Sequence, residues 1–131
     1  MFCYSPNFTD PDPLRRLEEI EAEKKAMRVA AFFGARTCRV LSGQRYPEVP
    51  RQDGVRWVVD AIRSLLPKAE ELKIILAMEN HYKDNYWKYP EFAQTPLFVT
   101  NALLALPWLP TMLFTARTRP LFWMVRLLLM L

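Results

Sequence analysis

The sequence is poor in glycine, cysteine and histidine, and these shortages exclude several protein classes. It has 3 Gly, 2 Cys and 1 His in 131 residues. The two cysteines, Cys3 and Cys38, are too few for a disulfide framework and lack metal-site spacing, so a reducing, cytoplasmic setting is expected. The N-terminus has no basic stretch followed by an apolar one, so no secretory signal is predicted. Phosphate-binding loops, glycine-rich dinucleotide motifs, serine-hydrolase elbows and zinc-protease motifs are also absent.

Acidic residues are missing after position 94. All 14 Asp and Glu precede that point, together with all but three of the 18 basic residues. The net charge of +4 therefore arises mainly from Arg117, Arg119 and Arg126, and residues 1–94 are nearly neutral. Because the charges are balanced and scattered, they form no phosphate-binding stripe, and no nucleic-acid partner is expected.

Two helices are predicted in residues 1–94. The first begins at the capping pair Asp12-Pro13 and ends at Gly34, and its many glutamates are expected on a solvated face. Asp53 can cap the second helix, which continues past an expected kink at Pro67. The apolar stripe of the first helix is predicted to comprise Leu17, Ile20, Lys24, Met27 and Ala31.

Two strands alternate with these helices, at residues 37–42 and 74–79. Both are apolar without regular alternation, which is typical of parallel strands covered on their faces. The order predicts an α/β fold, either an open doubly wound sheet or a barrel.

The C-terminal part has a different composition. Residues 92–116 carry no charge, and residues 96–116 are long enough to span a bilayer, although three prolines interrupt them. Residues 95–131 are therefore predicted to be an apolar, helical tail of uncertain origin: frame-shifted, misjoined or membrane-associated.

The second strand ends on Glu79-Asn80-His81, and the first ends near Ser42 and Gln44. In parallel α/β folds, active sites form where strands end, at their carboxyl ends. Burying a charged Glu inside a strand costs free energy, whereas at the carboxyl end of the strand the carboxylate can hold a cation or move a proton. The alternative interpretation is that these polar residues only mark where each strand leaves the core.

Three segments together resemble the sugar phosphate isomerase/epimerase family of xylose isomerase-like TIM barrels. They are RTCRVLSGQRYPEV, DGVRWVVDAIRSLLPKAEEL and LAMENHYKDNYWKYPEFAQ, and the segment before them is similar to a preceding βα unit. The resemblance covers residues 3 to about 94. It implies that residues 1–94 are a partial (β/α)8 barrel domain of two or three βα units.

The resemblance also implies a chemistry. Glu79 would be a ligand of a divalent metal (Mn²⁺, Mg²⁺, Co²⁺ or Zn²⁺) and a catalytic proton carrier beside the carbonyl of a sugar or polyhydroxy substrate. Such proton transfer isomerises or epimerises the substrate. The implied substrate-binding residues are Asn80, His81, Arg39, Ser42 and Gln44.

The chain departs from the family in extent. A complete barrel needs roughly 250 residues, and the further Asp, His and Glu ligands of later strands have no counterpart after Glu91. The chain alone is therefore expected to be inactive, and the edge at residues 74–78 to be unpaired and prone to self-association. The competing hypothesis is a small membrane-associated or interaction protein anchored by residues 96–116.

Overall fold

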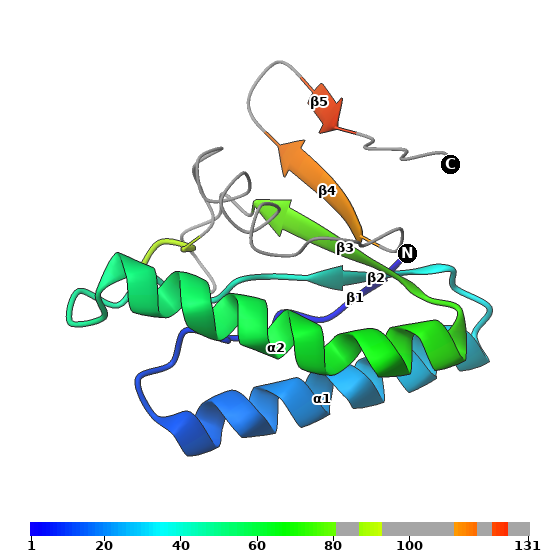
Figure 1. The fold of residues 1–131 in the computed structure, drawn as a ribbon. Coiled ribbons are helices and arrows are strands. Elements are labelled where there is room, and N and C mark those ends of the chain that lie inside the picture. The colour runs from blue at the N-terminus through cyan, green and yellow to red at the C-terminus, as the bar shows by residue number, and fades with distance from the viewer. Residues whose placement is uncertain (81–86, 93–111, 118–121, 126–131) are drawn as a thin grey trace.

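The computed structural model describes residues 1–80, 87–92, 112–117 and 122–125. Its elements in chain order are β1 (Phe2–Cys3), α1 (Pro13–Phe32), β2 (Thr37–Val40), α2 (Arg51–Leu72), β3 (Ile75–Asn80), β4 (Met112–Arg117) and β5 (Phe122–Val125). The described strands form one sheet in the order β1-β2-β3-β4-β5 (Figure 1). Strands β1 to β4 are parallel, and β5 is antiparallel to β4.

The strand order distinguishes between the two architectures that the sequence allows. Strands β1, β2 and β3 are neighbours in chain order, and α1 and α2 lie side by side on the same side of the sheet (Figure 1). A doubly wound sheet reverses its strand order and places helices on both sides, whereas a barrel adds each strand next to the last and keeps its helices outside. The described residues therefore form part of a barrel, which confirms the predicted fold class.

Both helices pass directly into strands through the same C-terminal motif. At the end of α1, the N–H of Ala35 donates to the carbonyl of Ala30 (2.9 Å) while Gly34 has φ +71°. At the end of α2, Lys73 adopts the left-handed conformation with φ +54°, and the N–H of Ile74 donates to the carbonyl of Ala69 (2.9 Å). This six-residue Schellman closure reverses the chain at once, so each following strand starts within a few residues of its helix.

Of the two helix N-caps predicted from the sequence, only one is observed. Asp12 caps α1, because its carboxylate accepts from the N–H of Leu14 (2.9 Å). The prediction that Asp53 caps α2 is wrong, since the helix starts at Arg51 and Asp53 lies in its first turn, paired with Arg56 at 2.8 Å. The carboxylate of Asp53 still favours the positive end of the helix dipole.

The core lies between the helices and one face of the sheet. Cys38 and Val40 of β2 and Leu76 and Met78 of β3 are buried there. Alternate residues point the other way, and Ile75 is 40% exposed. None of the described helices lies on this second side, which we call the helix-free face of the sheet. Arg39 and Ala77 are register partners on it.

The buried stripe of α1 differs from the predicted one. The buried residues are Glu23, Ala26, Met27 and Ala30, while Leu17 is 59% exposed. The helix is rotated by about one position, which places small alanines where α1 meets its neighbours and buries a glutamate that was expected on the solvated face.

Glu23 is fully buried between α1 and β2. The thiol of Cys38 donates to its Oε1 at 3.3 Å, and its Oε2 has no hydrogen bond to any residue in the described ranges. Burial raises the pKa of Glu23 to about 7, because desolvation outweighs the Cys38 hydrogen bond and the attraction of Arg39. Burial likewise raises the pKa of the Cys38 thiol, so the thiol remains a donor.

The C-terminal prediction needs two corrections. Residues 112–117 and 122–125 are strands rather than part of a helical tail. The edge of β3 is also not exposed as predicted, because β4 pairs with it from Leu76↔Met112 to Asn80↔Ala116. A short apolar run is compatible with either a buried strand or a buried helix, so the sequence alone did not show that this segment pairs with β3.

The membrane alternative rests largely on residues outside the described ranges, since these omit 96–111. Within residues 1–80 and the shorter described segments, no helix combines the length and the apolarity that crossing a bilayer requires.

We predict that neutralising Glu23 removes a pH dependence of stability. The folded state favours protonated Glu23, so its contribution is complete below the unfolded value near 4.5 and is lost as pH rises through about 7. Wild type should therefore lose about 3 kcal/mol of unfolding free energy relative to Glu23→Gln between pH 4.5 and 8. Urea unfolding of both proteins over this range measures the difference.

Glu18→Gln is the matched control, because Glu18 is an exposed glutamate of the same helix. It should keep the wild-type pH dependence. Parallel stability curves for wild type and Glu23→Gln would show that Glu23 is not buried as described.

Candidate functional site

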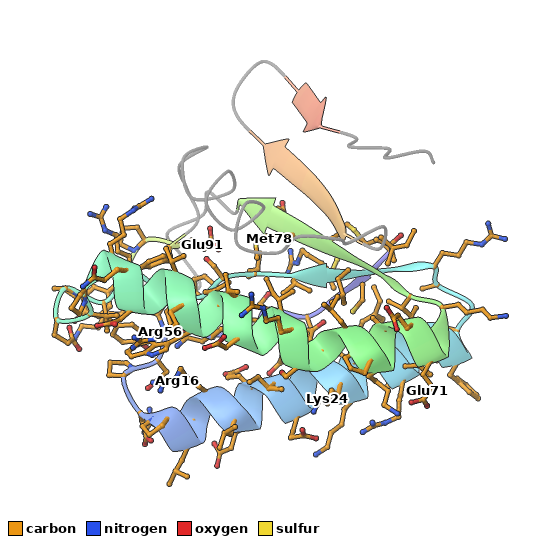
Figure 2. The ribbon with its side chains drawn as sticks, in the orientation of Figure 1. Arg16, Lys24, Arg56, Glu71, Met78 and Glu91 are labelled. Carbon is orange, nitrogen blue, oxygen red and sulfur yellow. The ribbon has the colours of Figure 1, made fainter. Side chains whose placement is uncertain are left out.

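Three loops meet where β1, β2 and β3 end. Residues 4–10 follow β1, residues 41–46 follow β2, and residues 87–92 return to the loop after β2 through the bridge Gln44↔Glu91. Figure 2 shows Glu91 near the N-terminal end of α2, at the end of the sheet toward which β2 and β3 run. This is the end where a parallel barrel places its chemistry.

The candidate residues Arg39 and Glu79 form an ion pair on the helix-free face. Nη1 of Arg39 lies 3.2 Å from Oε2 of Glu79, and the two side chains are only 18% and 16% exposed. Nη2 of Arg39 donates to Oγ of Ser5 (2.6 Å), and its Nε donates to the carbonyl of Tyr4 (3.4 Å). One guanidinium therefore links β2, β3 and the loop after β1.

The second carboxylate oxygen of Glu79 remains available. Its Oε1 makes no hydrogen bond to a described residue, while its Oε2 is fixed by Arg39. Glu79 is thus held through one carboxylate oxygen, while the other has no hydrogen bond to a described residue. That arrangement suits a base or a single ligand of a hard cation.

A complete metal site is not formed by the described residues. They contain no group of three or more His, Cys, Asp or Glu side chains that could hold a metal ion. Of the predicted residues, His81 lies outside the described ranges, and the side chain of Asn80 is not described either. Glu79 is therefore the one predicted metal ligand whose position the structure provides.

Ser42 and Gln44 both connect loops, but only Gln44 also lines a cavity. Ser42 is fully buried, and both its N–H (3.0 Å) and its hydroxyl donate to Oε1 of Glu91. The N–H of Gln44 donates to Oδ1 of Asn7 (2.9 Å), and its Oε1 accepts from the N–H of Tyr89 (3.1 Å). Sequence reasoning did not identify Glu91, because only the return of residues 87–92 brings it to Ser42.

A polar cavity of about 640 Å³ lies beside these loops. Ser5 lines it and also accepts from Arg39, so the cavity adjoins the Arg39–Glu79 pair. Tyr46 accepts from Asn7 (2.9 Å) and donates to Asp10 (3.2 Å), and burial raises the pKa of its hydroxyl, which keeps it a donor. The residues that line the cavity are Tyr4, Ser5, Asn7, Asp10, Arg15, Glu18, Glu19, Gln44, Tyr46 and Trp87.

This lining could not be deduced from sequence spacing. Asn7 and Asp10 belong to the loop after β1, Tyr46 to the loop after β2, and Trp87 to the segment that returns after β3. The available signal was the number of polar and aromatic residues just beyond each strand. Such a mixture of aromatic faces and hydrogen-bonding groups suits a hydroxyl-rich ligand.

Comparisons with known proteins agree with this architecture. A family model described as xylose isomerase-like TIM barrel matches residues 1–96. No curated protein matches the chain.

Three solved structures share its fold. A protein of Sinorhizobium meliloti 1021 is 20% identical, with a TM-score of 0.66 over 86% of this chain and 41% of its own. The 3-keto-D-glucoside 4-epimerase of E. coli is 17% identical, with a TM-score of 0.62 over 87% and 46%. The D-psicose 3-epimerase of Clostridium cellulolyticum H10, solved with D-tagatose, is 12% identical, with a TM-score of 0.67 over 87% and 41%. The chain therefore spans less than half the length of these structures.

Gly43 allows the loops after β1 and β2 to pack against each other. It has φ +112°, and a Cβ there would lie 2.5 Å from Oγ1 of Thr9, 2.6 Å from Oδ1 of Asn7 and 2.9 Å from the backbone nitrogen of Phe8. Only glycine satisfies both the backbone angle and the close approach.

We expect Gly43→Ala to lower the free energy of unfolding by about 2–4 kcal/mol, because it combines backbone strain with overlap against a neighbouring loop. Gly34→Ala is the matched control, since Gly34 also has positive φ but a Cβ on it would meet no heavy atom within 4 Å. Its cost should be only about 1 kcal/mol. Equal costs in denaturant unfolding would show that the loops do not pack as described.

Proposed function

The chain belongs to the xylose isomerase-like TIM barrel family, and from that premise we propose that Glu79 is the centre of a metal-assisted sugar isomerase or epimerase site. The observation that carries this proposal is the position of Glu79 at the carboxyl end of β3, on the helix-free face, with Oε2 held and Oε1 available. Two structures that share the fold are named as sugar epimerases, which supports a sugar as the substrate class.

In this proposal Glu79 has two roles. Its Oε1 contributes one oxygen ligand to a divalent cation, of which Mn²⁺, Mg²⁺, Co²⁺ and Zn²⁺ are the candidates. When bound, such an ion polarises a carbonyl and its neighbouring hydroxyl. Glu79 would remove the proton from the carbon beside the carbonyl, leaving an enediolate, and return it to the neighbouring carbon (isomerisation) or to the other face of the same carbon (epimerisation). This transfer requires the base within hydrogen-bonding reach of the substrate.

The other predicted residues take supporting roles. Arg39 orients Glu79 through Oε2 (3.2 Å), and Gln44 lines the cavity in which a hydroxyl-rich substrate is expected. Asn80 and His81 directly follow Glu79 in the chain and are proposed to contact the substrate. Ser42 acts indirectly, because its hydroxyl is bonded to Glu91 and is fully buried.

One carboxylate gives weak cation binding. Divalent ions such as Ca²⁺ and Mg²⁺ take about six oxygen ligands, and a site with few protein donors keeps mostly water. Because this chain spans less than half of the structures it matches, we propose that it binds the cation weakly and turns over substrate poorly by itself.

The proposal predicts Mn²⁺ binding that depends on Glu79. Calorimetric titration of the chain should give a dissociation constant on the order of 10⁻³ M, as expected for a ligand-poor site. Glu79→Gln keeps the size of the side chain but removes its charge, and should weaken binding by about tenfold or more. Glu48→Gln changes an exposed glutamate in the same way and should bind like wild type. Equal affinity of wild type and Glu79→Gln would refute the assignment of Glu79 as the ligand.

A further inference from the structure

We propose that Arg39 is an internal counter-cation of Glu79 with which a divalent cation must compete, so that Arg39 sets the cation affinity of the site. The inference rests on the proposed function, because it concerns the same carboxylate. It assigns to Arg39 a positioning role through Glu79 rather than a contact with the reacting atoms.

The first argument is that the guanidinium already neutralises Glu79. A guanidinium stays protonated at every physiological pH, and Nη1 lies 3.2 Å from Oε2 of Glu79. Both side chains are more than four-fifths shielded from solvent. Water therefore screens this pair less than a surface pair, and each charge is strongly felt by the other.

The second argument is that Arg39 is anchored. Its Nη2 donates to Ser5 at 2.6 Å and its Nε donates to the carbonyl of Tyr4 at 3.4 Å, so all three guanidinium nitrogens have partners. Moving the guanidinium away from Glu79 would break these additional bonds. Arg39 is therefore a fixed charge beside the carboxylate, unlike a long surface side chain that swings into solvent.

The third argument follows from charge. A doubly charged ion at Oε1 of Glu79 would lie within a few ångströms of the guanidinium, and like charges repel in a poorly solvated site. It would also withdraw electron density from the carboxylate that Arg39 binds. The ion is therefore opposed both by repulsion and by the loss of an existing pair, and removing the charge of Arg39 should strengthen cation binding.

The described surroundings offer no other cation that could take over this role. Among the described residues, three other arginines near the same ends of the strands do not pair with Glu79. Arg15 lines the polar cavity, Arg16 donates to the carbonyls of Asp10 and Pro11, and Arg45 is exposed after β2. In the described part of the chain, the ion pair of Glu79 is with Arg39. A change at position 39 therefore acts on Glu79 directly.

The test is a Mn²⁺ titration of the full chain, with free Mn²⁺ followed by electron paramagnetic resonance. Arg39→Met preserves much of the side-chain volume and removes the charge, and should bind Mn²⁺ about tenfold more tightly than wild type. Arg39→Lys keeps the charge and should stay close to wild type. The double variant Arg39→Met/Glu79→Gln should not show the tighter Mn²⁺ binding of Arg39→Met.

Arg36→Met is the matched control, because it removes the same charge from an exposed residue just before β2, at the opposite end of the strand. It should change the affinity by less than about twofold, since solvent and distance screen its charge. Thermal unfolding by circular dichroism verifies that each variant is folded, and Arg39→Gln replaces Arg39→Met if the latter does not fold.

The outcomes separate this inference from the proposed function. Glu79-dependent binding in wild type that is unchanged or weaker in the neutral Arg39 variants overturns the inference and leaves the proposed function standing. Absence of Glu79-dependent binding in wild type and in every Arg39 variant overturns both. Tighter binding in the neutral variants, lost again with Glu79→Gln, supports both.

Discussion

The two-residue period of β2 is the constraint on which both the core and the candidate site depend. Cys38 and Val40 point into the layer under the helices and are fully buried, so the intervening Arg39 has to lie on the helix-free face. The parallel register then pairs Arg39 with Ala77, which places Glu79 one pleat further along the neighbouring strand. The ion pair is thus a consequence of core packing, and a shift of one residue in β2 would turn a charge into the core.

The loops at the carboxyl ends are held together mainly by backbone and buried polar groups. Glu91 accepts from the N–H of Ser42, and the N–H of Phe92 donates to the carbonyl of Gly43 at 2.8 Å. The ring of Phe92 packs so closely against Gly54 of α2 that a Cβ on Gly54 would lie 2.5 Å from it. The segment after β3 therefore also packs against α2. These contacts fix the loop after β2, the segment 87–92 and α2 relative to one another.

The sequence predicted those features that are encoded locally. Asp12 and Gly34 mark the ends of α1, and the apolar run that stops at Glu79 marks the end of β3, because capping and burial depend on near neighbours. Features set by distant contacts were missed or wrong. Glu23 was assigned to the solvated face since its helical neighbours are charged, and the contact of Ser42 with Glu91 spans 49 positions. The pairing of β3 with β4 was missed because an apolar segment carries no mark of the edge that it will join.

Among the described residues, the acids Glu23, Glu91 and Glu79 are largely removed from water, and each is accommodated differently. Glu23 lies among apolar groups with only a thiol donor, so it is stabilised by retaining its proton, as its raised pKa of about 7 reflects. Glu91 receives a backbone N–H and a hydroxyl, which stabilise a carboxylate by directed hydrogen bonds. Glu79 is balanced by the charge of Arg39 at one oxygen. Protonation and buried hydrogen bonds adapt an acid to its place in the fold, whereas a charge at one oxygen leaves the other able to meet a ligand. The type of compensation, more than the depth of burial, therefore sets Glu79 apart from the other two acids and supports the role that we propose for it.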